Sequence, residues 1–161
     1  NDIPLEAGQT STGCTSYYLD AGDGALFPFG YGLSYTTFAY SDPVISSSEI
    51  APDGSLTVSC TVSNTGSREG SDVAQLYVRD HIGSLVRPVR ELRGFEKVTL
   101  KPGESRVVTF TLRPDDLAFY NTPTTRVVEP GEFSVWISPD SQSGNPAKFN
   151  VVDQPSVAAN N

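Results

Sequence analysis

Apolar and polar residues alternate along several short stretches of the chain. In residues 55–64, SLTVSCTVSN, every second position is apolar, which is the period of a half-buried β-strand. The same period recurs in residues 72–80 and 105–112. Shorter strand-like runs lie between turn residues at 36–40, 42–46, 94–100, 125–138 and 147–153. No stretch has the period of an amphipathic helix, so the pattern predicts about seven or eight strands in an all-β, two-sheet sandwich.

The alternation also predicts which side chains face the core. Ten positions of the three longest strands should point inward: Leu56, Val58, Cys60, Val62, Ala74, Leu76, Val78, Val108, Phe110 and Leu112. Trp136 alternates with Val135 and Ile137, so it should lie on the outer face of its sheet. An immunoglobulin domain would instead bury a Trp beside an inter-sheet disulfide. Because that arrangement is missing, a sandwich of the fibronectin type III kind fits better.

Proline and glycine mark the turns between these strands. In residues 101–105, KPGES, Pro102 and Gly103 occupy the positions that a type II turn requires. A second Pro-Gly turn lies within 125–138, and Pro43 places the first strand at an edge or a bulge. Residues 113–120, RPDDLAFY, can form one helical turn. Its two adjacent aspartates, Asp115 and Asp116, would then stabilise the helix N-terminus.

The stretch LFPFGYGLSYTTF, residues 26–38, is the most aromatic part of the chain. It contains five aromatic residues, and Gly30 and Gly32 alternate with the rings. Burial of one such ring removes about 150–250 Å² from water, and glycines let a backbone pass close to another surface. We therefore expect a buried seam here, with a β-strand leaving it.

Length and composition indicate one domain with appended segments. Residues 1–25 are polar and aperiodic apart from a short patch around Tyr17 and Tyr18, so they predict a linker. Residues 26–153 form the expected sandwich, and 154–161 a tail. A net charge of −8 excludes nucleic acid and anionic membranes as natural partners. The chain lacks Met and begins at a polar Asn1, which suggests a portion of something longer, and a secretory signal could have stood upstream.

Chemical motifs are absent from this sequence. His81 is the only histidine, and no G-x-S-x-G elbow surrounds a serine, so a Ser-His-Asp site is not expected. One histidine and two separated cysteines do not make a zinc site, and DAGDG (20–24) fits a turn better than a calcium loop. Asp115 and Asp116 are adjacent, unlike glycosidase carboxylates. We expect no catalytic residue, cofactor or metal, and a buried Cys60 thiol, with a Cys14–Cys60 bridge as the alternative.

Two features indicate contact with another surface. Five of the 11 basic residues fall within nineteen positions: Arg79, Arg87, Arg90, Arg93 and Lys97. They form either a solvated strand face or a docking site for an acidic partner. An outward Trp136 is either covered by a loop or a neighbouring domain or a platform on which a sugar ring stacks.

Five sequence blocks together resemble one known module. They are LFPFGYGLSYTTF, QLYVRD, RPVRELRGFEKVTLKPGES, FTLRPDDLAFY and VVEPGEFSVWI. In this order they resemble the C-terminal fibronectin type III-like domain of glycoside hydrolase family 3, in the β-glucosidase and β-xylosidase group. The resemblance extends from about Tyr17 to Ile137.

The resemblance implies a parent enzyme with a barrel domain, an α/β sandwich domain and then this module, joined covalently or as a nicked subunit. A retaining mechanism in that family uses an Asp and a Glu from the upstream domains, so neither lies in this chain. The block 26–38 corresponds to the junction between the α/β sandwich and the module. Candidate interdomain contacts are therefore Tyr17, Tyr18, Phe27, Phe29, Tyr31, Arg87, Arg90 and Arg93.

These observations favour a non-catalytic module of a secreted or periplasmic β-glycosidase, most simply a β-glucosidase acting on β-linked oligosaccharides. The module would stabilise the catalytic domains by packing against them, and its linker would border the substrate entrance. In the junction, we expect Phe27, Phe29 and Tyr31 to contact a neighbouring domain, whereas Tyr35 and Phe38 begin the sandwich. The alternative is an independent carbohydrate- or polymer-binding module that uses Trp136.

Overall fold

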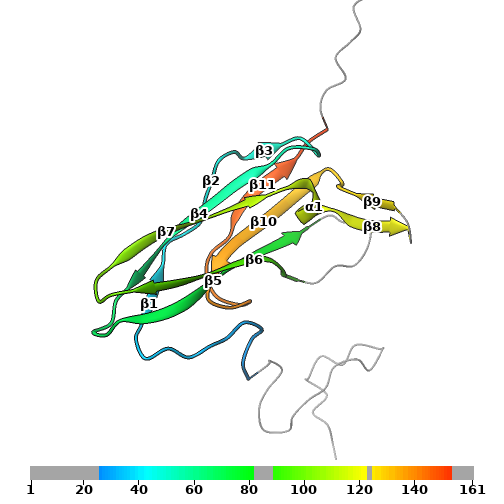
Figure 1. Ribbon diagram of the computed structural model, residues 1–161. Coiled ribbons are helices and arrows are strands. Elements are labelled where there is room, and N and C mark those ends of the chain that lie inside the picture. Colours follow the sequence, from blue (N-terminus) through cyan, green and yellow to red (C-terminus); the bar gives the residue numbers. More distant parts are fainter. Residues whose placement is uncertain (1–25, 82–88, 123–124, 154–161) are drawn as a thin grey trace, which may run out of the picture.

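The computed structural model describes residues 26–81, 89–122 and 125–153. Two β-sheets pack face to face in this part of the chain (Figure 1). The four-stranded sheet contains β1 (Phe38–Tyr40), β2 (Val44–Ile45), β4 (Leu56–Asn64) and β7 (Ser105–Leu112). The five-stranded sheet has the order β3 (Glu49–Ile50), β11 (Ala147–Val151), β10 (Gly131–Ser138), β5 (Gly70–Asp80) and β6 (Glu91–Leu100). The predicted two-sheet sandwich is confirmed.

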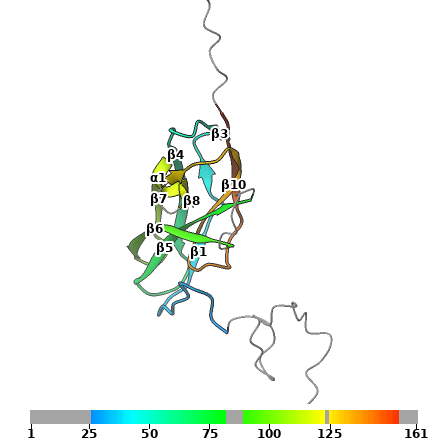
Figure 2. The ribbon, with the colours of Figure 1, turned by 90° about the vertical axis from the view of Figure 1, so that its right-hand side faces the viewer.

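The first predicted strand is divided into short pieces. β1 and β2 both pair antiparallel with β4, β1 at its end and β2 nearer its start. Pro43 lies between β1 and β2, outside both ladders. Proline has no backbone N–H to donate, so within a strand it would interrupt the pairing. β3 then crosses to the other sheet and pairs parallel with β11. The first residues of the described chain and the end of β11 lie at opposite ends of the sandwich in both views (Figure 2).

The core lies between the two sheets and matches the alternation in the sequence. The inward positions of β4 and β5 are buried, as predicted, and so are Val108 and Leu112 of β7. Phe110 is half-buried and packs against this cluster. β10 and β11 add two aromatic rings, Phe133 and Phe149, which stack with their centroids 5.4 Å apart. These contacts close the apolar interior of the sandwich.

The segment after β7 forms a helical turn and a hairpin. α1 (Pro114–Leu117) begins where expected, and the Asp116 carboxylate accepts a hydrogen bond from the Arg113 backbone N–H at 2.7 Å. β8 (Phe119–Thr122) and β9 (Thr125–Val127) follow as a separate two-stranded hairpin. The sequence did not indicate that Phe119 and Tyr120 would extend as a strand. Among the described helices, none is long and apolar enough to cross a membrane.

The turn chemistry agrees with the sequence prediction. Gly103 has a φ of 75°, and the Glu104 N–H donates to the Lys101 carbonyl at 3.0 Å. A bulge between Leu76 and Tyr77 shifts the register of β5 and β6, so that Leu76 pairs with Gly94 but Tyr77 with Leu92. Arg93 is the extra residue on β6, at the edge of the five-stranded sheet.

Candidate docking surface

The aromatic stretch crosses the outer face of the five-stranded sheet and is held there by its backbone. The Phe29 carbonyl accepts hydrogen bonds from the Ser141 N–H at 2.9 Å and the Tyr77 hydroxyl at 3.4 Å. The Gly30 carbonyl accepts from the Gln75 amide at 3.0 Å. Tyr77 also donates to the Gln75 side-chain carbonyl at 2.6 Å. The polar side-chain groups of Gln75 and Tyr77 on β5 therefore bind the backbone of the aromatic stretch, although Gly30 lies 45 residues before Gln75 in the sequence.

Gly30 makes this close approach possible. Its φ is +80°, in the left-handed region that favours glycine. A Cβ at this position would lie 2.1 Å from Gln75 Oε1 and 2.7 Å from the Tyr77 hydroxyl oxygen. Both the backbone angle and the contact with β5 thus require a residue without a side chain. Gly32 has no such constraint, since a Cβ there would meet nothing within 4 Å.

The side chains of the stretch point away from the sandwich. Phe27 and Tyr31 stack on one another at a centroid distance of 5.0 Å and an interplanar angle of 30°. Even so, the large side chains are exposed: Leu26 81%, Phe27 62%, Phe29 67%, Tyr31 46%, Leu33 88% and Tyr35 94%. Within this chain the expected buried seam is wrong, because the stretch buries its backbone polar groups rather than its rings.

Tyr35 and Phe38 differ in their places in the fold. Phe38 begins β1 and packs against the core, as predicted. Tyr35 was expected to begin the sandwich as well, but this is wrong, since it precedes β1 and its side chain is almost fully exposed. Pairing starts only at Phe38, opposite Asn64. The sandwich therefore begins three residues later than the last exposed ring.

A groove opens beside the aromatic stretch. It has a volume of ≈ 960 Å³ and runs between the start of β6 and the β8–β9 hairpin. Phe29, Val89, Leu92 and Tyr120 give it exposed apolar walls. The guanidinium-bearing residues Arg90, Arg93 and Arg126 also line it. The groove and the aromatic stretch meet at Phe29, so they form one continuous surface, which we call the docking face.

Arg90 and Trp136 form the floor behind this face. The Arg90 guanidinium lies over the Trp136 ring, 4.2 Å from its centroid, and donates to the Ser143 carbonyl at 2.9 Å. Burial lowers the pKa of Arg90 from its ordinary value. Trp136 projects from the outer face of β10, opposite Tyr77 as predicted, yet only 6% of it is exposed. A ring covered in this way offers no face for a sugar, so the stacking platform is not supported.

Arg93 and Arg126 bring positive charge to the rim of the groove. Arg93 donates to the Glu91 carboxylate, whereas its Nε is buried and has no hydrogen-bond partner in the described part of the chain. Arg126 contacts the exposed Asp115 carboxylate at 3.3 Å and lies 5.7 Å from the Tyr120 ring centroid. Such exposed ion pairs contribute little to stability. Each arginine thus already has a carboxylate partner within the chain, and Arg126 also donates to the Asp115 backbone carbonyl at 2.7 Å.

The loop after β10 supports the docking face from behind. The Asp140 carboxylate accepts hydrogen bonds from the backbone N–H groups of Gln142 and Ser143, each at 2.8 Å, and from the Ser143 hydroxyl at 2.7 Å. Burial alone would raise the pKa of Asp140, but these hydrogen bonds lower it below its ordinary value. The ordered loop presents Ser141 to Phe29 and Ser143 to Arg90.

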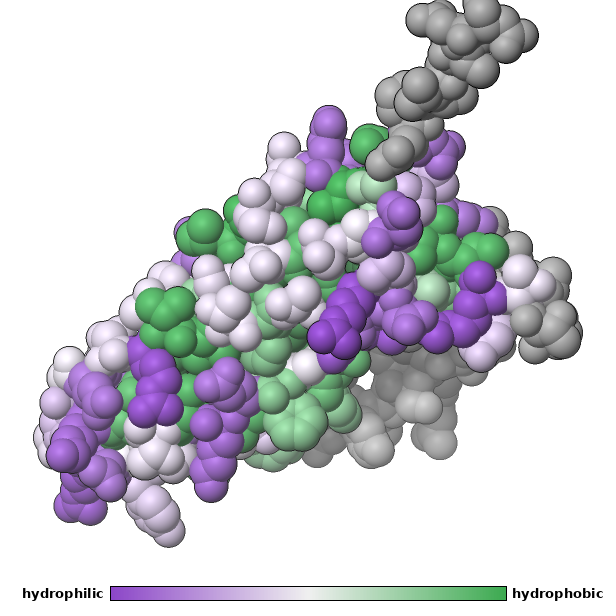
Figure 3. Space-filling model, turned by 45° about the horizontal axis from the view of Figure 1, so that its top comes forward, coloured by the Kyte–Doolittle hydropathy of each residue, from purple (hydrophilic) through white to green (hydrophobic). Residues whose placement is uncertain are grey.

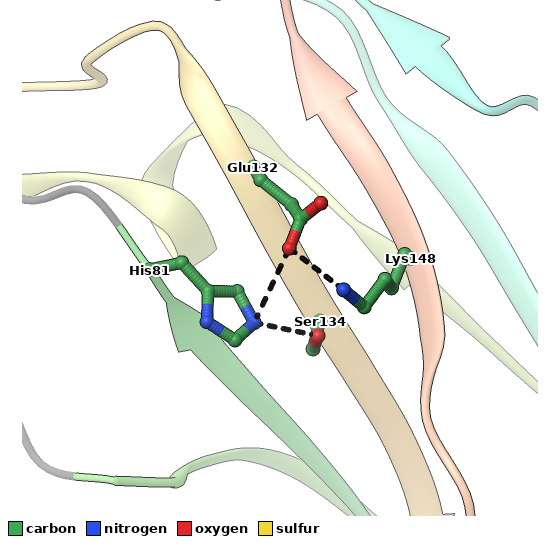
Figure 4. A network of polar contacts seen from close by, with 4 residues as sticks. All are labelled: His81, Glu132, Ser134 and Lys148. Atoms are coloured by element: carbon green, nitrogen blue, oxygen red, sulfur yellow. Dashed lines mark hydrogen bonds and ion pairs between the residues drawn. The ribbon is translucent and has the colours of Figure 1, made fainter.

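His81 lies in a polar network that joins three strands but does not form a catalytic triad (Figure 4). Its Nε2 is 2.8 Å from the Ser134 hydroxyl and 3.9 Å from the Glu132 carboxylate, which also pairs with Lys148. A triad needs the serine and the acid on opposite ring nitrogens, whereas both contacts here involve Nε2. Among the described residues, no group of His, Cys, Asp and Glu could hold a metal.

Among the described residues, the basic cluster is divided between two places. Arg90 and Arg93 line the groove, whereas Lys97 lines a second hollow of ≈ 340 Å³ beside Tyr31 and Leu33. Tyr17, Tyr18, Arg87, Cys14 and the 20–24 turn lie outside the described residues. Cys60 is a buried free thiol, as predicted.

Sequence reasoning missed the residues that build the docking face from behind. These are Gln75, Tyr77, Tyr120 and Arg126. The first two occupy outward positions of β5, and their large polar side chains were the available signal. Apolar side chains are also exposed elsewhere, for example Val44 and Val107 on the four-stranded sheet. In the face drawn in Figure 3, apolar residues lie interspersed with polar ones.

Comparison with known proteins agrees with the fold. Residues 72–141 match the family of the fibronectin type III-like domain. The chain is 47% identical over 138 residues to a periplasmic β-glucosidase of Salmonella typhimurium. The aligned region covers 86% of this chain and 18% of that protein. A β-xylosidase of Formosa agariphila is 47% identical over 118 residues, covering 73% of this chain and 16% of that protein. A solved β-glucosidase of Erythrobacter marinus superposes with a TM-score of 0.81 at 43% identity, covering 91% and 19%.

The fold and the family match together define a fibronectin type III-like domain. The chain spans less than a fifth of the length of the relatives just described, at 16%, 18% and 19%. It belongs to the fibronectin type III-like modules found within family 3 glycoside hydrolases, the relatives being named β-glucosidase or β-xylosidase.

Proposed function

We propose that this module packs against the catalytic domains of a family 3 β-glycosidase and stabilises them through the docking face. The observation that carries the proposal is that the backbone of the aromatic stretch is bound to the module whereas its aromatic side chains are exposed. Its carbonyl groups are hydrogen-bonded to β5 and to Ser141, while the rings of Phe27, Phe29 and Tyr31 face outward. A segment fastened in this way presents its apolar surface to another body.

The exposed rings carry enough apolar area for a stable contact. Complete burial of an aromatic side chain removes about 150–250 Å², at roughly 25 cal/mol per Å². Covering the three half-exposed rings therefore contributes on the order of 5–10 kcal/mol before the costs of association. Apolar patches of this kind mark interfaces rather than solvated surface. The aromatic stretch has the properties of an interdomain contact.

The parent activity that we propose is the hydrolysis of terminal β-linked sugars, with a β-glucosidase as the first choice. The catalytic Asp and Glu would reside on the barrel and α/β sandwich domains of the parent. Residues 1–25 would serve as the linker from those domains and border the substrate entrance, with 26–153 as the module and 154–161 as its tail. The name of the Salmonella relative, a periplasmic enzyme, supports export to the periplasm or beyond.

A chimera tests this proposal. The chain would replace the matching segment of the Salmonella typhimurium periplasmic β-glucosidase, and activity on an aryl β-glucoside and the midpoint of thermal unfolding would be measured. We expect an active chimera, and no turnover above background from residues 1–161 alone. The combined substitutions Phe27→Ser, Phe29→Ser and Tyr31→Ser should lower the temperature midpoint of unfolding of the chimera. They should hardly change the midpoint of the isolated chain.

The matched control is Val44→Ser, because Val44 is 66% exposed on the other sheet. It should leave the chimera unchanged. Equal losses in the chimera and in the isolated chain would show that the rings serve the module itself, and turnover by the isolated chain would contradict a non-catalytic role.

A further inference from the structure

The groove differs in chemistry from the aromatic stretch that it adjoins. Apart from Phe29 and Tyr77, its lining comes from residues 89–93 at the start of β6, from Ala118 and the β8–β9 hairpin, and from the loop after β10. A volume of ≈ 960 Å³ is in the range of sites that enclose whole ligands or several side chains. The aromatic stretch offers projecting rings, whereas the groove is a hollow. A partner must therefore insert a segment here.

The charge of the groove is opposite to that of the chain. Three arginines and one glutamate line it, in a protein with a formal net charge of −8. Opposed potentials of this kind select a partner of complementary charge. The groove suits an occupant with a carboxylate, which arginine binds with two parallel hydrogen bonds.

The existing partners of these arginines leave room for such an occupant. Arg126 makes its ion pair with Asp115, an aspartate whose side chain is 89% exposed. Arg93 has a buried Nε without a hydrogen-bond partner among the described residues, and a group of this kind requires an explanation in a folded protein. Arg126 also donates to the Asp115 backbone carbonyl at 2.7 Å. A carboxylate at the rim would replace the exposed Asp115 carboxylate as the partner of Arg126, at a small cost because exposed ion pairs are weak.

The apolar walls restrict the occupant further. Val89 is 68% exposed and Tyr120 58% exposed, and both line the groove beside the arginines. A free anion would leave these walls in water, whereas a protein segment with an acidic residue beside an apolar one would cover both. The groove is also continuous with the aromatic stretch through Phe29. The same partner body can thus reach both parts of the docking face.

We propose that the groove between β6 and the β8–β9 hairpin binds an acidic loop of the parent's catalytic body, with its carboxylate at Arg93 and Arg126 and an apolar neighbour against Leu92 and Tyr120. This inference rests on the proposed function and adds a second point of attachment to it. One contact would leave the module free to pivot about the aromatic stretch. Two contacts of different chemistry fix its orientation on the catalytic domains.

Site-specific photo-crosslinking in the chimera tests the inference. The substitution Leu92→p-benzoylphenylalanine places the probe in the groove, and Phe27→p-benzoylphenylalanine places it in the aromatic stretch. Val107→p-benzoylphenylalanine is the control on the far sheet. Mass spectrometry of the products should identify, from position 92, a peptide of the catalytic body that contains Asp or Glu. Position 107 should give no such product.

A charge reversal then tests the role of the arginines. Arg126→Glu should lower the crosslinking yield from position 92 by about tenfold, equivalent to about 1.4 kcal/mol, whereas Arg126→Lys should retain most of it. Lys101→Glu, in the turn after β6, is the matched control and should change nothing. Higher salt should lower the yield from position 92 more than that from position 27.

The outcomes separate this inference from the proposed function. Crosslinks from position 27 without any from position 92 overturn the groove contact and leave the docking role standing. No crosslinks from either position overturn both. A product from position 92 that joins two copies of this chain, that lacks an acidic residue, or that is insensitive to Arg126→Glu overturns the acidic-loop assignment.

Discussion

The two faces of the five-stranded sheet are both covered at its central strands β5 and β10, but by different means. The inner face presents mainly apolar side chains to the opposite sheet, including Leu76, Phe133 and Ile137. The outer face presents Gln75, Tyr77 and Trp136, which are also buried, with only 6%, 1% and 6% of each exposed. These residues are covered by loops and by the aromatic stretch, through hydrogen bonds and one cation–π contact. The inner face holds the module together, and the outer face holds the surface that it offers to a partner.

This difference matters because the two kinds of burial fail differently. Loss of apolar area in the core lowers the stability of the whole sandwich. Loss of a hydrogen bond on the outer face frees a short segment while the sandwich remains folded. Substitutions on the two faces should therefore separate global unfolding from local release of the docking face.

The largest effect is expected on the inner face. Phe133→Ala removes a ring that is 1% exposed and stacked on Phe149, which should cost about 3–5 kcal/mol of unfolding free energy. Urea denaturation of the isolated chain measures it. Phe95→Ala, at a position that is 70% exposed in the same sheet, is the control. Similar losses for the two variants would contradict the asymmetry between buried and exposed rings.

A pH profile distinguishes the faces by their titrating groups. Burial raises the pKa of the Cys60 thiol from 9.0 to about 11. The unfolded chain loses this proton first, so the contribution of Cys60 is complete below pH 9 and disappears as the pH rises towards 11. Urea midpoints between pH 8 and 11 should fall, and Cys60→Ala should flatten the fall by an amount on the order of 2 kcal/mol.

Tyr77 provides the comparison from the outer face. Burial raises its pKa too, with Asp140 nearby adding to the rise. Tyr77→Phe should remove a smaller part of the alkaline loss than Cys60→Ala does. A profile that neither variant changes would place the alkaline sensitivity elsewhere in the molecule.

Gly30→Ala should release the aromatic stretch without unfolding the core. The new Cβ meets Gln75 and Tyr77 at a positive φ, a conflict of about 1–3 kcal/mol. Amide hydrogen exchange at Tyr31 and Ser141, whose N–H groups are hydrogen-bonded to Pro28 and Phe29, should accelerate by about tenfold or more. Gly32→Ala has open space and should behave like the unsubstituted chain. Unchanged amide exchange in the Gly30→Ala variant would contradict the conclusion that the close contact of Gly30 with β5 holds the aromatic stretch in place.

The smallest effect is expected from one hydroxyl. Tyr77→Phe removes the donor shared by Phe29 and Gln75, at a cost of about 1 kcal/mol. The same exchange measurement should show a smaller acceleration than Gly30→Ala gives, with the urea midpoint nearly constant. A large fall in that midpoint would mean that Tyr77 belongs energetically to the core.

Much of the fold could be predicted because strand alternation reports burial directly. Leu56 and Val58 on β4, and Ala74 and Leu76 on β5, are buried as their period indicated. The Pro-Gly turn at 102–103 and the helical turn at Pro114 follow from local backbone preferences. β9 lies within the strand-like run predicted at 125–138, but β8 escaped prediction because its first residues were assigned to the helical turn at 113–120. The register of these two strands is set by pairing with each other rather than by the core.

The candidate site could be predicted only in part. Arg90 and Arg93 were singled out and do line the groove, but Tyr120 and Arg126 were not. The hairpin brings those two residues next to β6 although they are about thirty positions later in the sequence. Contacts of this kind depend on how separate elements pack, and no local pattern records them.

The sequence by itself determined the class of fold and the core-facing positions, because apolar period and turn chemistry are local properties. Five of its sequence blocks, taken together, also resembled one module family. It also marked residues 26–38 as too aromatic for an ordinary loop. Only the tertiary structure decided that Gln75 and Tyr77 bind the backbone of that stretch and turn its rings outward. That outcome depends on which polar groups meet across the fold, since a buried carbonyl must find a donor.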